Sequence, residues 1–361
     1  MASFYLLLIY MLIRLSQASP TCGIYMDCKT CADGGSCRWC PLDRNCHDKD
    51  SLRNSCLKNQ NIVSSTMCKE MKYGKYDPKA AFSYTLMSAA AYSKDPQYCL
   101  KQIYPSSDFK IEKQIRHRCE DLPLFRHEEC FAYTSVSHEK KIILVAYRGT
   151  IIHGLQILDQ IVSILTEPKT SFPAGGKVQH YFANAHKKLY QGVNASVTSL
   201  LKTYPTYDIV ITGHSLGGAL ASLAAVSLVY HRVVPVSRMS LYTFGSPRVG
   251  DKEYALNHDQ LVNNSWRVVH NRDIVSHLPT CNLITGCTFP TNGPYHHRTE
   301  IFYPNVTMNK GSLYVHCKGD DDDNCSDGAI TNNPCTIDLI QCIEYHLDYF
   351  GLHVGTICDH V

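Results

Sequence analysis

One short segment restricts the fold of this chain more than any other: a predicted strand that turns sharply into a predicted helix. The apolar run Asp208–Thr212 is followed by Gly213-His-Ser-Leu-Gly217, and a helix-prone stretch covers 216–230. Glycine is needed two residues either side of the serine, because a side chain there would clash in a tight strand-to-helix turn. The helix N-terminus then directs its free N–H groups toward the serine.

The turn allows two interpretations of its serine. Ser215 is a candidate nucleophile, and Gly213, His214 and Gly217 form the turn around it. Alternatively, Ser215 is an ordinary N-cap of the following helix. The pentapeptide alone is weak evidence, since composition predicts it on the order of 0.1 times in a chain of this length. The strand before it and the helix after it favour the nucleophile.

Short β-branched runs alternate with helical patterns after about Lys69. This alternation predicts an α/β domain with a mostly parallel sheet covered by helices. The runs predicted as strands are 142–147, 208–212, 239–244 and 266–270, and the helical patterns are 80–91, 181–203 and 216–230.

The cysteines divide the chain into two modules. Eight of the 18 cysteines lie between Cys22 and Cys68, among few apolar residues, and the next is Cys99. About fifty such residues cannot bury much of a core, so disulfides are expected to stabilise them. We therefore predict a cysteine-rich module at 19–68 and an α/β domain at 69–361. Zinc is the alternative, because two C-x-x-C spacings occur here: Cys28–Cys31 and Cys37–Cys40.

The first 18 residues are typical of a secretory signal peptide. A short apolar run at 4–13 precedes small residues suited to cleavage. A membrane anchor is the alternative, but ten apolar residues cannot cross about 30 Å of hydrocarbon. Export predicts a secreted, extracellular and disulfide-bonded protein. Four N-glycosylation sequons fit this compartment: Asn194, Asn263, Asn305 and Asn324.

Charge indicates no nucleic-acid partner. The formal net charge is +3, and no basic cluster with interleaved aromatics occurs. The acidic run 318–324 suggests calcium, but it lacks EF-hand spacing and is predicted to be a solvated loop. No cofactor, metal or transmembrane segment is expected.

A nucleophilic serine needs a base, and the base needs an orienting acid. In a strand–turn–helix hydrolase the chain order is serine, acid, histidine. Asp273 follows the predicted strand 266–270, although it could also be a loop-capping aspartate. The residues alone leave the base open among His296, His297, His316, His346, His353 and His360.

Two resemblances narrow these choices. The segment CGIYMDCKTCADGGSCRWC, with Trp39 before Cys40, resembles the plexin–semaphorin–integrin (PSI) module, which implies a mostly structural role for 19–68. Four motifs, TGHSLGGALA, LYTFGSPRVGD, NRDIVSHLP and HLDYFGLHVGTIC, occur in the order of the class 3, filamentous-fungal triacylglycerol lipases. This resemblance implies an α/β-hydrolase fold with Ser215 as nucleophile, Asp273 as acid and His346 as base.

The lipase resemblance implies further site residues. Backbone N–H groups of Leu216 and Thr150 would form the oxyanion hole, the latter in Tyr147-Arg-Gly-Thr150. Segment 151–166 would be a lid supported by Asp159, although its apolar spacing also fits a core helix.

The same resemblance implies the disulfides Cys99–Cys358 and Cys317–Cys325. Pairing of near neighbours would add Cys119–Cys130, Cys281–Cys287 and Cys335–Cys342. One departure from the family leaves the substrate open, because Tyr181 replaces a small glycine near the site.

The sequence thus predicts a secreted serine ester hydrolase that acts on lipid esters, at a lipid–water interface, through an acyl-enzyme. A non-catalytic lipid-, glycan- or receptor-binding protein on the same scaffold is the alternative. The partner of the N-terminal module is unknown.

Overall fold

A computed structural model describes residues 22, 25, 28–40, 45–49, 51, 61–68, 74–119, 129–151, 161–162, 165, 168–280, 293–317, 322 and 324–359. The chain divides into two compact units, 1–71 and 72–361. No helix among the described residues combines the length and apolar character needed to cross a membrane.

The N-terminal unit is held together by disulfides around one tryptophan. Trp39 is buried among Cys22, Cys31, Cys37 and Cys46, and its backbone exchanges two hydrogen bonds with Ile62. The described bridges are Cys22–Cys37, Cys28–Cys68 and Cys31–Cys46, and Cys40 is also disulfide-bonded. The zinc alternative is therefore wrong, because these sulfurs are oxidised. The elements are α2 (Cys28–Asp33), β1 (Cys37–Cys40), β2 (Asn45–Asp48) and η2 (Ser65–Met67).

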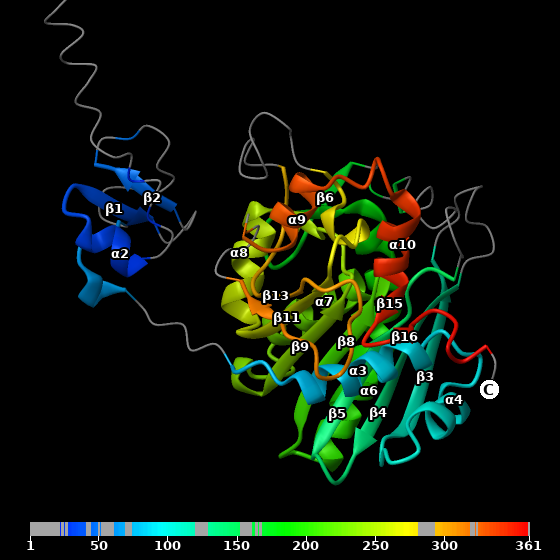
Figure 1. Ribbon diagram of the computed structural model, residues 1–361. Coiled ribbons are helices and arrows are strands. Elements are labelled where there is room, and N and C mark those ends of the chain that lie inside the picture. Colours follow the sequence, from blue (N-terminus) through cyan, green and yellow to red (C-terminus); the bar gives the residue numbers. More distant parts are fainter. Residues whose placement is uncertain are drawn as a thin grey trace, which may run out of the picture. The chain divides into compact units, whose positions relative to one another are not determined.

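The C-terminal unit is built on an eight-stranded mixed sheet (Figure 1). The four central pairings, from β5 through β8, β9 and β11 to β13, are all parallel, and the outer pairings are antiparallel. Parallel strands align their carboxyl ends at one edge, where such folds place their sites. In spatial order the strands are β14 (Val315–His316), β13 (Glu300–Tyr303), β11 (Asn264–His270), β9 (Met239–Phe244), β8 (Asp208–His214), β5 (Ile142–Tyr147), β4 (Glu129–Ser137) and β3 (Lys110–Arg118).

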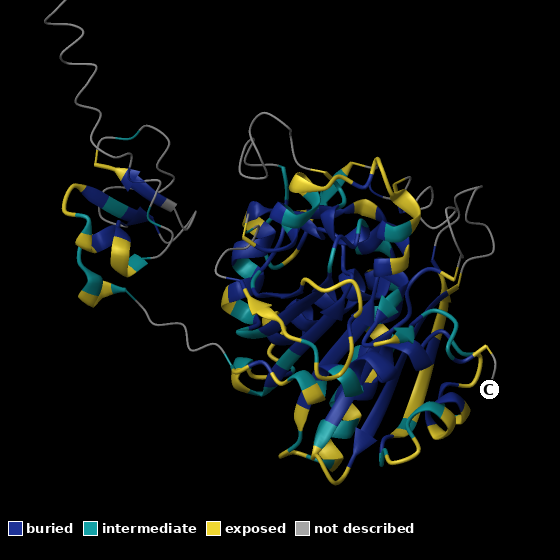
Figure 2. Cartoon of the chain, in the orientation of Figure 1, coloured by how far each residue is buried: buried dark blue, intermediate teal, exposed yellow. Residues whose placement is uncertain are grey.

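Helices cover both faces of this sheet. Ile209 and Ile211 of β8 join the apolar core that contains α6 (His180–Thr203) and α7 (Leu216–Tyr230). Val210, between them, joins the core that contains α3 (Pro78–Ala90) and α4 (Pro96–Ile103). The strand alternates between faces because side chains have a period of two. Figure 2 shows the resulting buried interior, in which α7 is buried almost all round.

Smaller elements complete the C-terminal unit. A second sheet has the strand order β12-β10-β7-β6, and β15 pairs with β16. Their bounds are β6 (Lys169–Ser171), β7 (Lys177–Gln179), β10 (Gly250–Asp251), β12 (Pro294–Tyr295), β15 (Asp348–Tyr349) and β16 (Leu352–His353). The remaining helices of the described residues are η4 (Val236–Arg238), α8 (Lys252–Leu261), η5 (Val275–His277), α9 (Ser326–Asn332) and α10 (Leu339–Leu347).

The structure confirms the predicted fold class and locates the elements the sequence missed. The four predicted strands correspond to β5, β8, β9 and β11, and the three helical patterns to α3, α6 and α7. The long hairpin β3–β4 was not predicted. Strand β3 reads KIEKQIRHR and is mostly exposed, so it shows little of the apolar alternation that reveals a strand.

Four disulfides are described in the C-terminal unit, and all were expected. They are Cys99–Cys358, Cys119–Cys130, Cys317–Cys325 and Cys335–Cys342. The expected pair Cys281–Cys287 lies outside the described residues.

Candidate active site

Ser215 stands on a strained turn between β8 and α7. Its φ is 57° and its ψ is −132°, and its side chain makes no capping hydrogen bond. Ser215 thus occupies the N-cap position of α7, but its side chain does not cap the helix. A Cβ on Gly213 would overlap the Gly217 carbonyl, and one on Gly217 would overlap the carbonyl of Tyr147. Both glycines are required by close backbone approach, as the spacing predicts.

Three residues far apart in sequence meet at this turn. The Ser215 Oγ lies 2.9 Å from His346 Nε2, and His346 Nδ1 lies 3.0 Å from each carboxylate oxygen of Asp273. All three side chains are buried. Because a carboxylate only accepts, Nδ1–H must donate to Asp273, and Nε2 of the neutral ring is left to accept the serine proton.

The surroundings of Asp273 keep it ionised. Its Oδ1 accepts from the backbone N–H of Val275 at 2.9 Å, and its Oδ2 accepts from the Tyr349 hydroxyl at 2.6 Å. Burial raises the pKa of Asp273, but the charge and hydrogen bond of His346, together with the Tyr349 hydrogen bond, outweigh burial and lower the pKa to about 2. Asp273 therefore both caps a loop and orients His346.

His214, beside the serine, secures the backbone of His346. Burial, with help from His346, lowers the pKa of His214 to about 3, so its ring is neutral. Its Nε2 lies 2.7 Å from the His346 carbonyl, which only accepts, so Nε2 carries the proton. Its Nδ1 then accepts from the Tyr92 hydroxyl at 2.8 Å. One ring thus links the turn after α3 to the segment of the candidate base.

Three residues around the site were not singled out from the sequence: Tyr92, Gly245 and Tyr349. Gly245 has φ of 59°, and a Cβ there would lie 2.6 Å from Asp273 Oδ2 and 2.8 Å from His346 Nδ1. Gly245 and Tyr349 stand within the LYTFGSPRVGD and HLDYF segments. The spacing of those segments does not reveal contacts across strands, so only the structure assigns these residues to the site.

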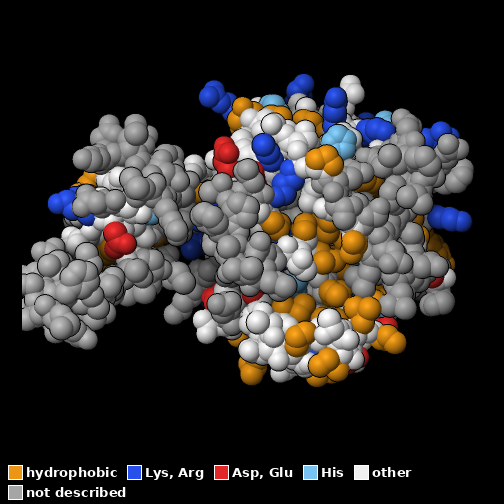
Figure 3. Space-filling view, turned by 90° about the horizontal axis from the view of Figure 1, so that it is seen from above, with side chains coloured by type: hydrophobic (Ala, Val, Ile, Leu, Met, Phe, Trp, Pro, Cys, Tyr) orange, Lys and Arg blue, Asp and Glu red, His pale blue; other side chains and the backbone are white. Residues whose placement is uncertain are grey.

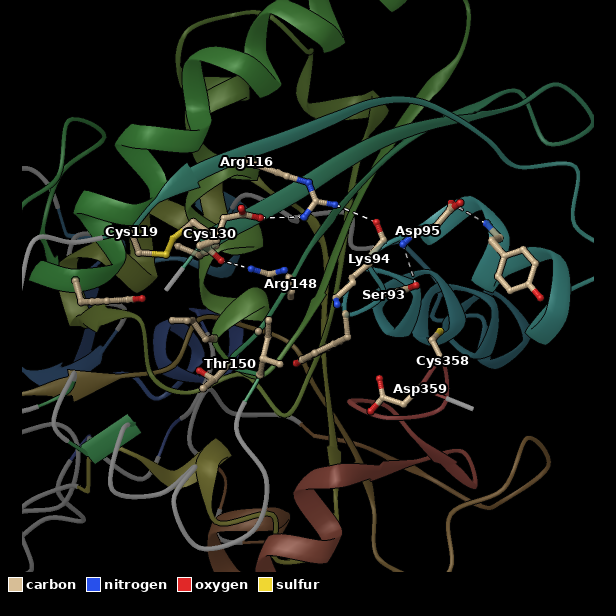
Figure 4. A pocket seen from close by; sticks show the side chains of 18 residues that line it. Ser93, Lys94, Asp95, Arg116, Cys119, Cys130, Arg148, Thr150, Cys358 and Asp359 are labelled. Carbon is tan, nitrogen blue, oxygen red and sulfur yellow. Dashed lines mark hydrogen bonds and ion pairs between the residues drawn. A yellow bond between two sulfur atoms is a disulfide. The ribbon is translucent and has the colours of Figure 1, made fainter. Parts of the chain in front are cut away.

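A cavity of about 920 Å³ opens beside the serine turn. Thr150, Leu216 and Tyr181 are among its lining residues, and charged side chains, including Arg116 and Arg148, line it as well (Figure 4). The Thr150 hydroxyl is buried without a hydrogen-bond partner in the structure. The N–H of Leu216 belongs to the first turn of α7, where no intrahelical acceptor exists. Both groups are hydrogen-bond donors at the cavity.

The other candidate bases lie away from Ser215 or outside the described chain. His296 donates to the Ser276 carbonyl at 2.7 Å, His316 is exposed on β14, and His353 bonds Thr356. His297 is stacked on His258, with ring centroids 3.6 Å apart. His360 and the lid-supporting Asp159 lie outside the described residues.

The predicted lid and sequons are only partly described. Of segment 151–166, Ile161 and Leu165 are buried, whereas Ile151 and Val162 are exposed. Asn305 and Asn324 are exposed, and Asn194 and Asn263 are half-buried. Asn305 and Asn324 are therefore more accessible to a glycosyltransferase than Asn194 and Asn263.

Five buried histidines of the C-terminal unit have lowered pKa values. Burial is the largest cause of a lowered pKa in each of His186, His214, His277, His296 and His297. An unfolded histidine titrates near pH 6.5. Below that pH the unfolded chain binds protons that the folded chain excludes. The stability contributed by these buried histidines is therefore complete above about pH 6.5 and is lost as the pH falls toward 3.

We expect the thermal unfolding midpoint to fall steadily between pH 6.5 and pH 4.5. Each of these histidines should lower the free energy of unfolding by up to about 1.4 kcal/mol per pH unit once it is protonated in the unfolded chain. Circular dichroism melts across this range measure the slope. His186→Asn should reduce the slope, while the exposed His316→Asn should leave it unchanged. A flat profile would mean that the folded protein accepts these protons.

Comparisons with known proteins agree with this geometry. Residues 144–283 match the family model described as lipase (class 3). A lipase of Caenorhabditis elegans is 34% identical over 312 residues, covering 80% of this chain and 85% of that protein. A Rhizomucor miehei lipase is 32% identical over 224 residues, covering 60% of this chain. The chain spans about half, 54%, of that fungal protein's length.

Solved structures give the same result. A triacylglyceride lipase of Rhizomucor miehei has a TM-score of 0.60 at 25% identity, covering 80% of this chain and 99% of that one. A lipase of Rhizopus microsporus var. chinensis has a TM-score of 0.61 at 27% identity, covering 79% and 91%. A third structure, with a TM-score of 0.59 at 26% identity, is of a triacylglycerol lipase in which a serine protease triad forms the catalytic centre, and it covers 80% and 99%. This chain therefore belongs to the class 3 lipases, a family of carboxylic ester hydrolases.

Proposed function

We propose that the protein hydrolyses lipid esters through an acyl-enzyme on Ser215. The observation that carries the proposal is the buried Ser215–His346–Asp273 chain of hydrogen bonds, at 2.9 Å and 3.0 Å. A serine hydroxyl is a weak nucleophile until a positioned base takes its proton. The His346 ring is oriented for that transfer by the ionised Asp273.

The reaction follows from these positions. Ser215 Oγ attacks the ester carbonyl carbon while its proton passes to His346 Nε2. When the tetrahedral intermediate collapses, the carbon–alkoxide bond breaks and His346 returns the proton to the leaving alcohol. Water then attacks the acyl-enzyme by the same proton path, releasing the acid and restoring Ser215. Asp273 stabilises the imidazolium in both halves.

Thr150 and Leu216 are proposed to hold the oxyanion. Both line the cavity beside Ser215, and the Thr150 hydroxyl has no partner in the structure. Donors fixed before substrate binds need no reorganisation when negative charge develops. The Leu216 N–H and the Thr150 N–H and hydroxyl are the donors that we assign to this role.

The relatives support lipid esters as the substrate class. Proteins similar to this one are named lipases, and two more are named secreted mono- and diacylglycerol lipases, of Fusarium solani and Gibberella zeae. We propose that the protein is secreted, as its first 18 residues and its disulfides favour. Segment 151–166 is proposed as a lid that opens at a lipid surface, with Asp159 behind it.

The N-terminal unit is proposed to be a PSI-like structural module. Its support is the buried Trp39 and the disulfides around it. A unit of this size depends on such bridges because its apolar core is small.

Covalent labelling together with ester turnover tests the proposed function. A fluorophosphonate should label the native protein at Ser215, as located by peptide mass mapping, and should abolish turnover of p-nitrophenyl butyrate. Emulsified triolein and phosphatidylcholine would then define the ester class. Ser215→Ala is the control, since it lacks the attacking hydroxyl. No label and no turnover from folded protein would favour a non-catalytic binding protein.

A further inference from the structure

A small disulfide-closed loop, whose second half is the first turn of the helix that carries the candidate base, bears exposed aliphatic side chains. Cys335 and Cys342 are bridged with Cα atoms 5.9 Å apart, and their sequence separation is 7. Within this loop Ile337 is 83% exposed, Ile340 is 68% exposed and Leu339 is 38% exposed. Single exposed aliphatic residues are common on protein surfaces. Here three lie within four positions of a covalently closed loop, so they form a cluster.

The apolar stripe of α10 continues beyond the protein core. Ile343 and Leu347 are buried in the main apolar core, and Ile340 lies on the same helical stripe at the spacings i, i+3 and i+7. Ile340 is nevertheless exposed, because this end of α10 points away from the sheet (Figure 1). The stripe therefore extends into solvent beyond the core that covers Ile343 and Leu347.

This loop lies close to the reacting atoms. Ile340 precedes His346 by six residues on one helix, which is about 9 Å along the axis at 1.5 Å per residue. The loop is also fixed to the edge of the sheet that carries the site. The Arg272 guanidinium, beside Asp273, donates to the Asn333 carbonyl at 3.2 Å, and the Ile274 N–H lies 3.5 Å from the Cys342 carbonyl.

The C-terminal unit presents further exposed apolar side chains. Figure 3 views it from above Figure 1 and shows hydrophobic side chains at several places on that face. Ile151 and Val162, at the start of the predicted lid and within it, are 52% and 45% exposed. Ile151 also lines the cavity, so exposed apolar side chains occur both at the cavity and on the Cys335–Cys342 loop.

We propose that the Cys335–Cys342 loop is an insertion wedge: Ile337 and Ile340 enter a lipid surface while His346, farther along α10, acts on the ester. This inference rests on the proposed lipid substrate. Three side chains are too little for a stable protein interface, which needs about 1,000 Å² or more. Shallow insertion into a bilayer or emulsion needs only an apolar tip on a rigid support. The disulfide makes the loop rigid, and so does the Asp338 side chain, which accepts from the Gln341 N–H at 3.4 Å.

A matched pair of double variants tests the wedge. The test variant is Ile337→Ser/Ile340→Ser. The control is Val306→Ser/Leu313→Ser, on the separate loop between β13 and β14, where the two side chains are 67% and 80% exposed. Binding is measured by co-sedimentation with vesicles of ether-linked phosphatidylcholine, which contains no carboxylic ester to hydrolyse. Turnover of dissolved p-nitrophenyl butyrate is measured in parallel.

The wedge predicts a loss of binding without a loss of chemistry. Vesicle partitioning of the test variant should fall about tenfold, which corresponds to about 1.4 kcal/mol, while the control changes less than twofold. Turnover of the dissolved ester should stay within twofold in both. Equal partitioning of both variants, no binding by native protein, or loss of soluble turnover in the test variant would overturn the proposal. Absent turnover and labelling in the native protein would instead refute the proposed function.

Discussion

Asp273→Asn should lower kcat for p-nitrophenyl butyrate by about 10⁴-fold. The reason lies in the donors around the carboxylate. Val275 N–H faces Oδ1, so the asparagine carbonyl should take that position and turn its NH₂ toward His346 and Tyr349. An NH₂ facing Nδ1 favours the tautomer that carries its proton on Nε2. His346 could then no longer accept the proton of Ser215.

The same substitution at an exposed aspartate is the control. Asp208 begins β8, and its side chain is 66% exposed. Asp208→Asn should leave kcat within twofold of the native value. Melting curves of both variants separate lost chemistry from lost folding. If Asp273→Asn lost less than a hundredfold while remaining folded, Asp273 would not set the tautomer of His346.

The elements that sequence reasoning located share one physical property: both of their faces are buried or strictly patterned. Strand β8 and helix α7 are buried almost throughout, so their apolar runs are continuous and their ends are marked by polar residues or glycine. The serine turn was predictable because its glycines are required by local backbone geometry. Local constraints leave local sequence patterns.

What the sequence did not reveal depends on contacts between distant segments. Six histidines were open as bases from the residues alone, and only the lipase resemblance separated His346 from the others. Tyr92 and Tyr349 act on partners far along the chain, in the Tyr92–His214 and Tyr349–Asp273 contacts, separated by 122 and 76 positions. No spacing within one segment carries that information. Hairpin β3–β4 was not predicted for another reason: its outer strand β3 faces solvent and lacks an apolar alternation.

The bridge Cys99–Cys358 should contribute more stability than any shorter bridge described here. It joins α4 to the C-terminal segment across 259 positions, whereas Cys119–Cys130 spans 11. In the chain-entropy account a crosslink stabilises by restricting the unfolded chain, and the effect grows with the logarithm of loop length. The two bridges should then differ by roughly 2–3 kcal/mol, at about 5.5 and about 3 kcal/mol.

Paired alanine variants measure this difference without leaving a free thiol. Cys99→Ala/Cys358→Ala should lower the unfolding midpoint by roughly 10 °C, and Cys119→Ala/Cys130→Ala by about half as much. Residues of both bridges line the cavity, so the comparison also controls for effects on the site. Equal losses of stability would mean that native-state packing, rather than the length of the closed loop, determines what these bridges contribute. In that case the long bridge would serve mainly to position the C-terminal segment beside the cavity.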